Sequence, residues 1–181
     1  IYRELSSWCQ AIVDKYTISD STWEASPSGY SYTGNWQPLQ FGGERYDARV
    51  KPEWRPASLY DAKDIDVSRQ EFKGNRIVDT VAPVSWTSYF KSSMQFDFGR
   101  TVTGWSQIDF PPMPEGTEMF IHYLDNLQST EYEETDIYVA RGKGKEHFTS
   151  RFHAHSFRYV SIQTANPDLQ ITKDRDRKSV V

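Results

Sequence analysis

The sequence predicts an all-β fold, an antiparallel β-sandwich of the jelly-roll type, and three observations support that prediction. Apolar and polar residues alternate in short runs along the 181-residue chain, and helix-period patterns of useful length are missing. Turn-forming Gly, Pro, Asn and Ser residues separate these runs at close spacing. Aromatic residues make up 15% of the chain, and aromatic rings pack well on the pleated surface of strands. Many short strands joined by turns are typical of sandwiches.

The expected strands follow one another along the whole chain. The apolar run 9–13 predicts a buried strand near the amino terminus. Apolar side chains occupy both faces of 117–124, as expected of a strand covered on both sides. The full set of expected strands is 8–14, 16–19, 22–25, 45–51, 76–84, 93–98, 104–110, 117–124, 136–140, 146–151, 157–163 and 169–172.

Residues 1–172 are expected to form a single sandwich module, and 173–181 a charged tail or linker to a missing domain. The least ordered stretches should be 26–35, 53–75 and the tail. The chain starts with Ile1 rather than Met and has no signal-peptide apolar run, which predicts a processed form or an excised fragment.

Charge and composition limit the classes of partner. The net charge is −4 without a basic stripe, so no nucleic-acid partner is expected. No apolar run approaches the roughly 18 residues that a membrane span needs, so no membrane partner is expected. Cys9 is the single cysteine and cannot form an internal disulfide. A periplasmic, secreted or cytoplasmic location remains open.

Four segments occur in an order that is informative. They are Gly-Glu-x-Tyr-Asp-Ala-Arg at 43–49, Asp-Phe-Gly with Gly-Trp at 97–105, Asp-x-Tyr-x-x-x-Gly at 136–142, and Arg-Phe-x-x-His-x-Phe-Arg-Tyr-Val at 151–160. This set resembles the β-sandwich region of bacterial α-L-rhamnosidases, glycoside hydrolase family 78. Thr101 stands where the family usually has Asn, and Ser156 where it has Gly.

The resemblance implies a galactose-binding-domain-like sandwich and a function related to carbohydrate. In the family, one type of sandwich domain binds L-rhamnose with the help of a calcium ion. The catalytic carboxylates of the family act in an (α/α)6 barrel that follows the sandwich region. We therefore expect no catalytic residue in this chain, and expect the parent protein to be an α-L-rhamnosidase-type glycoside hydrolase.

Residues 44–49 carry the strongest candidates for substrate binding. Alternation places Glu44 and Tyr46 on one face of the strand. Asp47 and Arg49 lie on the opposite face. Carboxylates and guanidinium groups form directed hydrogen bonds with sugar hydroxyls, so one interpretation is a sugar contact. The other is an ion pair, Asp47–Arg49 or Glu44 with an arginine, that fixes an interface with a neighbouring domain.

Tryptophans in turn-rich surroundings offer stacking surfaces for a sugar ring. Trp36 and Trp54 flank the 44–49 strand in such surroundings, and we expect one of them to line a sugar subsite. Alternatively they close the open ends of the sandwich. The tryptophans in strand-like contexts are expected in the core, and these are Trp8, Trp23, Trp86 and Trp105.

Calcium is the one cofactor that the sequence suggests. Asp97, and Asp125 with Asn126, are candidate ligands, because calcium takes six to eight oxygen atoms from such groups. His153 and His155 lie two apart on a strand without a further nearby ligand, which does not favour zinc. The acidic run 131–136 is interpreted as a solvated loop rather than a catalytic pair. Nucleophile and nucleotide-binding motifs are missing.

The leading hypothesis is therefore a non-catalytic sandwich module that recognises or positions L-rhamnose-containing glycans. The alternative is a structural scaffold that docks against a missing (α/α)6 catalytic barrel without binding sugar. The scaffold alternative predicts a wide apolar or charge-paired patch on the isolated domain.

Overall fold

The computed structural model describes residues 20–34, 42–58, 71, 76–127, 134–166, 168–169 and 179–180. All regular elements in these ranges are strands, which confirms the predicted all-β class. Among the same residues, no helix is long and apolar enough to cross a membrane. The chain divides into two units: Ile1–Ser28 with Pro52–Gly74, and Gly29–Lys51 with Asn75–Val181.

The described part of the first unit contains one short antiparallel pair. β1 (Glu24–Ala25) pairs with β4 (Arg55–Pro56). The Ala57 amide donates to the Trp23 carbonyl at 2.8 Å and extends this pairing.

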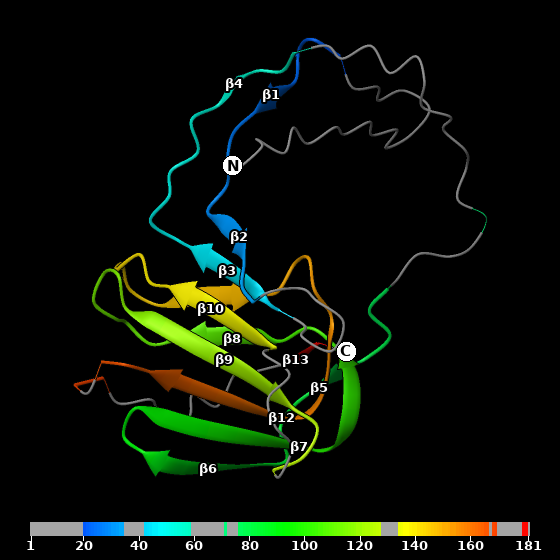
Figure 1. The fold of residues 1–181 in the computed structure, drawn as a ribbon, viewed down its shortest axis with the longest axis vertical. Coiled ribbons are helices and arrows are strands. Elements are labelled where there is room, and N and C mark those ends of the chain that lie inside the picture. The colour runs from blue at the N-terminus through cyan, green and yellow to red at the C-terminus, as the bar shows by residue number, and fades with distance from the viewer. Residues whose placement is uncertain are drawn as a thin grey trace. The chain divides into compact units, whose positions relative to one another are not determined.

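The second unit is built on a seven-stranded sheet with the order β2-β3-β10-β9-β12-β7-β6 (Figure 1). Every neighbouring pair is antiparallel except β3 and β10, which run parallel. The strands are β2 (Tyr30–Tyr32), β3 (Glu44–Asp47), β6 (Ser85–Phe90), β7 (Ser93–Gly104), β9 (Glu118–Leu124), β10 (Thr135–Val139) and β12 (His155–Thr164).

Two shorter pairs accompany this sheet, and the core lies between the layers. β8 (Gln107–Phe110) pairs with β11 (Glu146–Thr149), and β5 (Thr80–Val81) pairs with β13 (Ser179–Val180). Apolar side chains of β8 and β11 join those of the large sheet in one buried cluster. The most deeply buried members are Phe110, Phe148, Phe157, Met119, Ile121 and Ile162. This arrangement agrees with the predicted sandwich.

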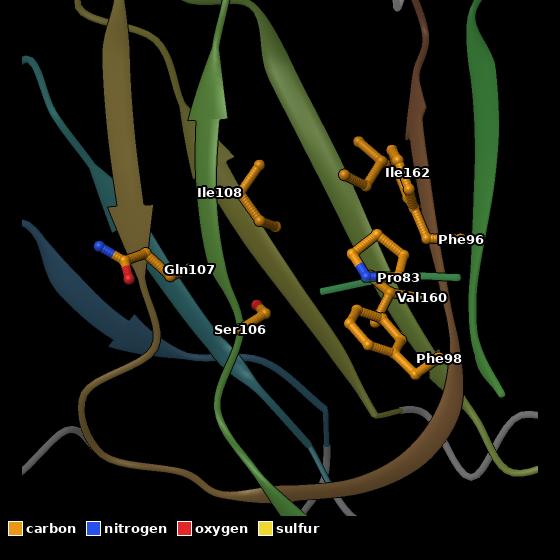
Figure 2. Close-up of a pocket in the computed structure, with 8 residues that line it drawn as sticks. All are labelled: Pro83, Phe96, Phe98, Ser106, Gln107, Ile108, Val160 and Ile162. Carbon is orange, nitrogen blue, oxygen red and sulfur yellow. The ribbon is translucent and has the colours of Figure 1, made fainter. Parts of the chain in front are cut away.

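A small cavity lies between the layers. Figure 2 shows Ile108 and Ser106 on one side of it and Phe96, Phe98 and Val160 on the other. Its volume is about 20 Å³, which is enough for roughly one water molecule. A space of this size is too small to hold a sugar ring.

Several sequence predictions need correction at the sheet edges. The stretch 26–35 was expected to be irregular but contains β2, because Tyr30 and Tyr32 pair with β3. Only Thr80–Val81 of the expected strand 76–84 is a strand, and β6 was not predicted. Trp86 was expected in the core but is 46% exposed, since β6 ends the order of the large sheet.

Other predictions fall on residues that the structure does not describe. The expected strands 8–14 and 16–19, and the residues Trp8, Cys9 and Trp36, lie outside the described ranges. Most of the predicted tail 173–181 does so too.

Candidate functional site

β3 has the two faces that strand alternation predicts. Glu44 is 1% exposed and Tyr46 packs against the core cluster. Arg45 and Asp47 lie on the other face, where their side chains approach to 3.7 Å. Gly43, the residue before β3, must lack a side chain, because a Cβ there would overlap the Thr135 carbonyl oxygen.

The Glu44 carboxylate holds the segment that follows β11. Its two oxygens accept the backbone N–H groups of Arg151 and Phe152, each at 2.8 Å. Burial raises the pKa of Glu44, and the two amides partly offset this rise. The ion-pair interpretation expected an arginine side chain here, and the structure has two backbone amides instead. The burial of Glu44 also argues against a direct sugar contact by this residue.

Asp136 lies on β10, the strand that pairs with β3, and its carboxylate contacts the Glu44 backbone. One carboxylate oxygen accepts the Glu44 amide at 2.8 Å. The other accepts the Tyr123 hydroxyl at 2.8 Å and the Ser150 hydroxyl at 2.6 Å. Burial alone would raise the pKa of Asp136, but hydrogen bonds, those from His155 foremost, lower it below its usual value. A fully buried carboxylate is thus kept charged by its donors.

His155 completes this buried group. Its ring nitrogens lie 3.3 Å from Asp136 and 3.2 Å from Glu134, and its ring stacks on Tyr123 with centroids 3.7 Å apart. Burial alone would lower the pKa of His155, but the two carboxylates raise it. Both nitrogens are occupied, so His155 is not a zinc ligand together with His153.

An aromatic surface lies next to this group, and we call Tyr30, Tyr46 and Phe152 the aromatic patch. Tyr30 stacks on Tyr46 with ring centroids 4.4 Å apart, and the Phe152 ring meets Tyr30 edge-on at 5.2 Å. Phe152 is 64% exposed. Tyr138 supports Tyr46 from the core side at 6.1 Å. The patch therefore presents one exposed ring, Phe152, which packs on Tyr30, and Tyr30 in turn stacks on Tyr46.

Two of the three patch residues, Tyr30 and Phe152, were not predicted from the sequence as site residues. Tyr30 alternates with Tyr32 between Gly29 and Gly34, which is a short strand signal inside the stretch expected to be irregular. Phe152 lies in one of the four family-like segments. The sequence offers no sign that the two rings meet.

The outer face of β3 carries paired charges. Asp47 accepts two hydrogen bonds from the Arg49 guanidinium, at 2.9 and 2.8 Å, and these bonds lower the pKa of Asp47 to about 2. Arg45 donates to Glu118 at 2.8 Å. The predicted Asp47–Arg49 ion pair is present, but its Arg49 side chain is 43% exposed, so the pair lies at the surface rather than in the interior.

The predicted stacking tryptophans are not part of the described second unit. Trp54 belongs to the first unit and is 59% exposed, as expected for a tryptophan outside the core. Trp36 lies outside the described residues.

The candidate calcium ligands are placed unfavourably. Asp97 uses both carboxylate oxygens to pair with Arg158, at 3.0 and 3.1 Å, and also accepts the Gly99 amide. Asp125 and Asn126 are exposed in the turn after β9. Within the described ranges, no group of three or more His, Cys, Asp or Glu side chains could hold a metal ion. Asp97 thus does not fit the predicted site, and two neighbouring residues alone supply too few oxygens.

Comparison with known proteins decides the family. The family model described as "Bacterial alpha-L-rhamnosidase concanavalin-like domain" matches residues 89–181, which is just over half of the chain. The chain belongs to this family. A relative named alpha-L-rhamnosidase from Alteromonas sp. (strain LOR) is 25% identical across 81% of this chain, and the match covers 17% of the relative.

Solved structures agree on the fold. An α-L-rhamnosidase from Dictyoglumus thermophilum covers 90% of this chain with a TM-score of 0.68 and 23% identity, and the match spans 20% of that protein. One from Streptomyces avermitilis, described as complexed with L-rhamnose, covers 81% with a TM-score of 0.61 and 21% identity, and the match spans 16% of it. The chain thus spans about a fifth or less of the rhamnosidases it matches.

Residues of the four family-like segments stabilise the sandwich by hydrogen bonds and ion pairs with one another and with buried groups. Asp97 and Arg158 belong to two different segments, and they pair with each other across β7 and β12. Tyr138 donates its hydroxyl to the buried Glu146 at 2.5 Å. Gly142 adopts a φ of 81°, and its amide donates to the same carboxylate. These positions maintain the rhamnosidase-family sandwich rather than form an open site.

Proposed function

We propose that this chain is a non-catalytic module of an α-L-rhamnosidase-type glycoside hydrolase, and that it recognises or positions L-rhamnose-containing glycans on the aromatic patch. The observation that carries the proposal is the exposed Phe152 ring, packed edge-on against Tyr30. An aromatic ring can cover the apolar C–H face of a sugar. Glu44 holds the Phe152 backbone, so little conformational entropy is lost when a ligand binds.

Polar groups for sugar hydroxyls lie beside the rings. Arg151 is exposed and interacts with the Tyr30 hydroxyl: burial raises the pKa of Tyr30, and Arg151 partly lowers it. A guanidinium group donates several directed hydrogen bonds, as vicinal hydroxyls require. A single site of this kind binds weakly, with a Kd in the micromolar to millimolar range, or about −4 to −8 kcal/mol.

Three buried carboxylates fit a non-catalytic role. Glycoside hydrolysis uses two carboxyl groups that face the scissile bond. Glu44, Asp136 and Glu146 are buried and bound to groups of the sandwich itself. The catalytic carboxylates would then belong to an (α/α)6 barrel elsewhere in the parent protein.

Isothermal titration with L-rhamnose tests the proposal. We expect saturable heat from the chain, and at least a tenfold higher Kd for Phe152→Ala. Phe90→Ala is the matched control, because Phe90 is also an exposed ring but lies on β6 at the far end of the sheet order. Equal Kd values for Phe152→Ala and the unchanged chain would disprove the role of the patch. Repeating the titration with calcium and then with a chelator tests whether calcium, the cofactor that the sequence suggests, takes part in binding.

A second candidate function, the docking scaffold, is favoured by β6. All six of its residues are exposed, and its large apolar side chains include Trp86, Tyr89 and Phe90. Exposed apolar patches commonly mark interaction surfaces. In this case Phe90→Ser would weaken the thermal stability of the parent enzyme but not that of this chain alone. No heat with L-rhamnose from a folded chain would favour this function over the first.

A further inference from the structure

We infer that Glu44, Asp136 and His155 act together as a proton-dependent latch that holds Arg151 and Phe152 in the position required by the aromatic patch. This inference rests on the proposed function only in assigning the patch to glycans. The latch itself is defined by contacts inside the second unit.

The first set of contacts in the latch connects Phe152 to β3. The amides of Arg151 and Phe152 donate to Glu44, and these residues are 107 and 108 positions away in sequence. The Ser150 hydroxyl, one residue earlier, donates to Asp136. Three consecutive residues are therefore fixed by two buried carboxylates.

The second set of contacts connects Glu44 and Asp136 to each other and to His155. The Glu44 amide donates to the Asp136 oxygen that also faces His155 Nε2. Any displacement of Asp136 therefore moves both the Glu44 backbone and Ser150. Glu134 approaches the other ring nitrogen, Nδ1, of His155 at 3.2 Å. The imidazole thus bridges two carboxylates, and both of these bonds are donated by His155 only when the ring carries its second proton.

The second proton on His155 determines the charge balance of this buried group. With a protonated His155, one buried positive charge faces several negative groups. After deprotonation, the ring no longer supplies a positive charge to these carboxylates. The titratable groups that face His155 are Glu44 of β3, Tyr123 of β9, Glu134 before β10, Asp136 of β10 and His153 before β12. Loss of the proton removes one hydrogen bond of the bridge and leaves the carboxylates to repel each other.

Two carboxylates and two backbone amides thus depend on one imidazole. Above the titration midpoint of His155, the Ser150–Phe152 segment should open more often, and the Phe152 ring should lose its fixed position against Tyr30. Below the midpoint the segment is held. The patch is therefore better organised under mildly acidic than under alkaline conditions.

Amide NMR of the complete chain without any sugar tests the latch. Between pH 5.5 and 9, we expect the Arg151 and Phe152 amide signals to shift with the same midpoint as the His155 ring. Their hydrogen-exchange protection should fall at least tenfold across that midpoint. In His155→Gln this pH dependence should disappear. In the control His147→Gln it should persist, because His147 is an exposed histidine that pairs with Asp109 on β8.

A milder variant keeps the test decisive if His155→Gln does not fold. Glu134→Gln removes one negative partner and should move the shared midpoint to lower pH. Equal protection of the two amides at pH 6 and pH 9 would overturn the latch, and so would an unchanged midpoint in Glu134→Gln.

Titration with L-rhamnose at both pH values then separates the two proposals. Binding at pH 6 that weakens at pH 9 supports both. Absence of binding at either pH, with the amide titration as expected, disproves the glycan role and leaves the latch intact.

Discussion

Glu44 has the chemical character of a residue that binds a ligand directly, but it influences the aromatic patch through the backbone amides of Arg151 and Phe152. Its carboxylate is buried, and it fixes the position of the exposed residues Arg151 and Phe152 by accepting their backbone N–H groups. Sequence reasoning identified Glu44 from its chemical type and its strand position. The role could not be predicted, because its partners are backbone amides more than 100 residues away.

Glu44→Ala should destabilise the chain by about 2–4 kcal/mol, because two buried amides lose their acceptor. Glu44→Gln keeps one acceptor oxygen and should cost less, about 1–2 kcal/mol. Urea denaturation measures both changes. Glu118→Gln serves as control, since its 43% exposed side chain makes only a surface pair with Arg45, which is worth about 0–1 kcal/mol. Equal losses for Glu44→Ala and Glu118→Gln would contradict the anchoring role.

At the scale of elements, the central strands of the sheet were predictable and the edge strands were not. β9 and β12 were expected near their observed bounds, because their apolar alternation reflects burial on the sheet. β6 carries Trp86, Tyr89 and Phe90, which in sequence resemble the rings of a core strand. Whether such rings are covered depends on the position of the strand in the sheet, and local sequence does not encode that position. Tyr30 was missed because it lies on a three-residue strand whose pairing with β3 depends on tertiary structure rather than on local sequence.

The junction between β3 and β10 depends on close backbone approach. A Cβ at Gly43 would lie 2.5 Å from an Asp136 carboxylate oxygen and would overlap Thr135. We expect Gly43→Ala to cost about 1–3 kcal/mol or more, as overpacking does. Gly144→Ala is the control: its site is open, and its φ of 66° should cost about 1–2 kcal/mol. Thermal and urea denaturation give both values, and a smaller loss for Gly43→Ala than for Gly144→Ala would refute the steric argument.

At the scale of the whole molecule, protonation of His155 couples stability to pH. The pKa of His155 is raised in the folded state, so its stabilising contribution is complete below the unfolded value of about 6.5 and is lost as pH rises through the folded pKa. His153 acts in the opposite direction, because burial and the neighbouring His155 lower its pKa. Its ionisation therefore disfavours the folded state as pH falls below about 6.5.

We therefore predict that the free energy of unfolding decreases from pH 7 to pH 9, and that His155→Gln flattens this decrease. Urea titrations at several pH values in constant ionic strength provide the measurement. His147→Gln should retain the slope of the unchanged chain. A slope that survives in His155→Gln would assign the pH dependence to another group.

The parallel pairing of β3 with β10 also determines where this chain can be shortened. A fragment limited to the family-matched residues 89–181 would keep β10 but lose β2 and β3. The backbone edge of β10 would then be open, and Asp136 would lose the amide of Glu44. Open, apolar-flanked edges pair readily with other chains. Such a fragment should aggregate, whereas a fragment that begins before Gly29 keeps the edge closed.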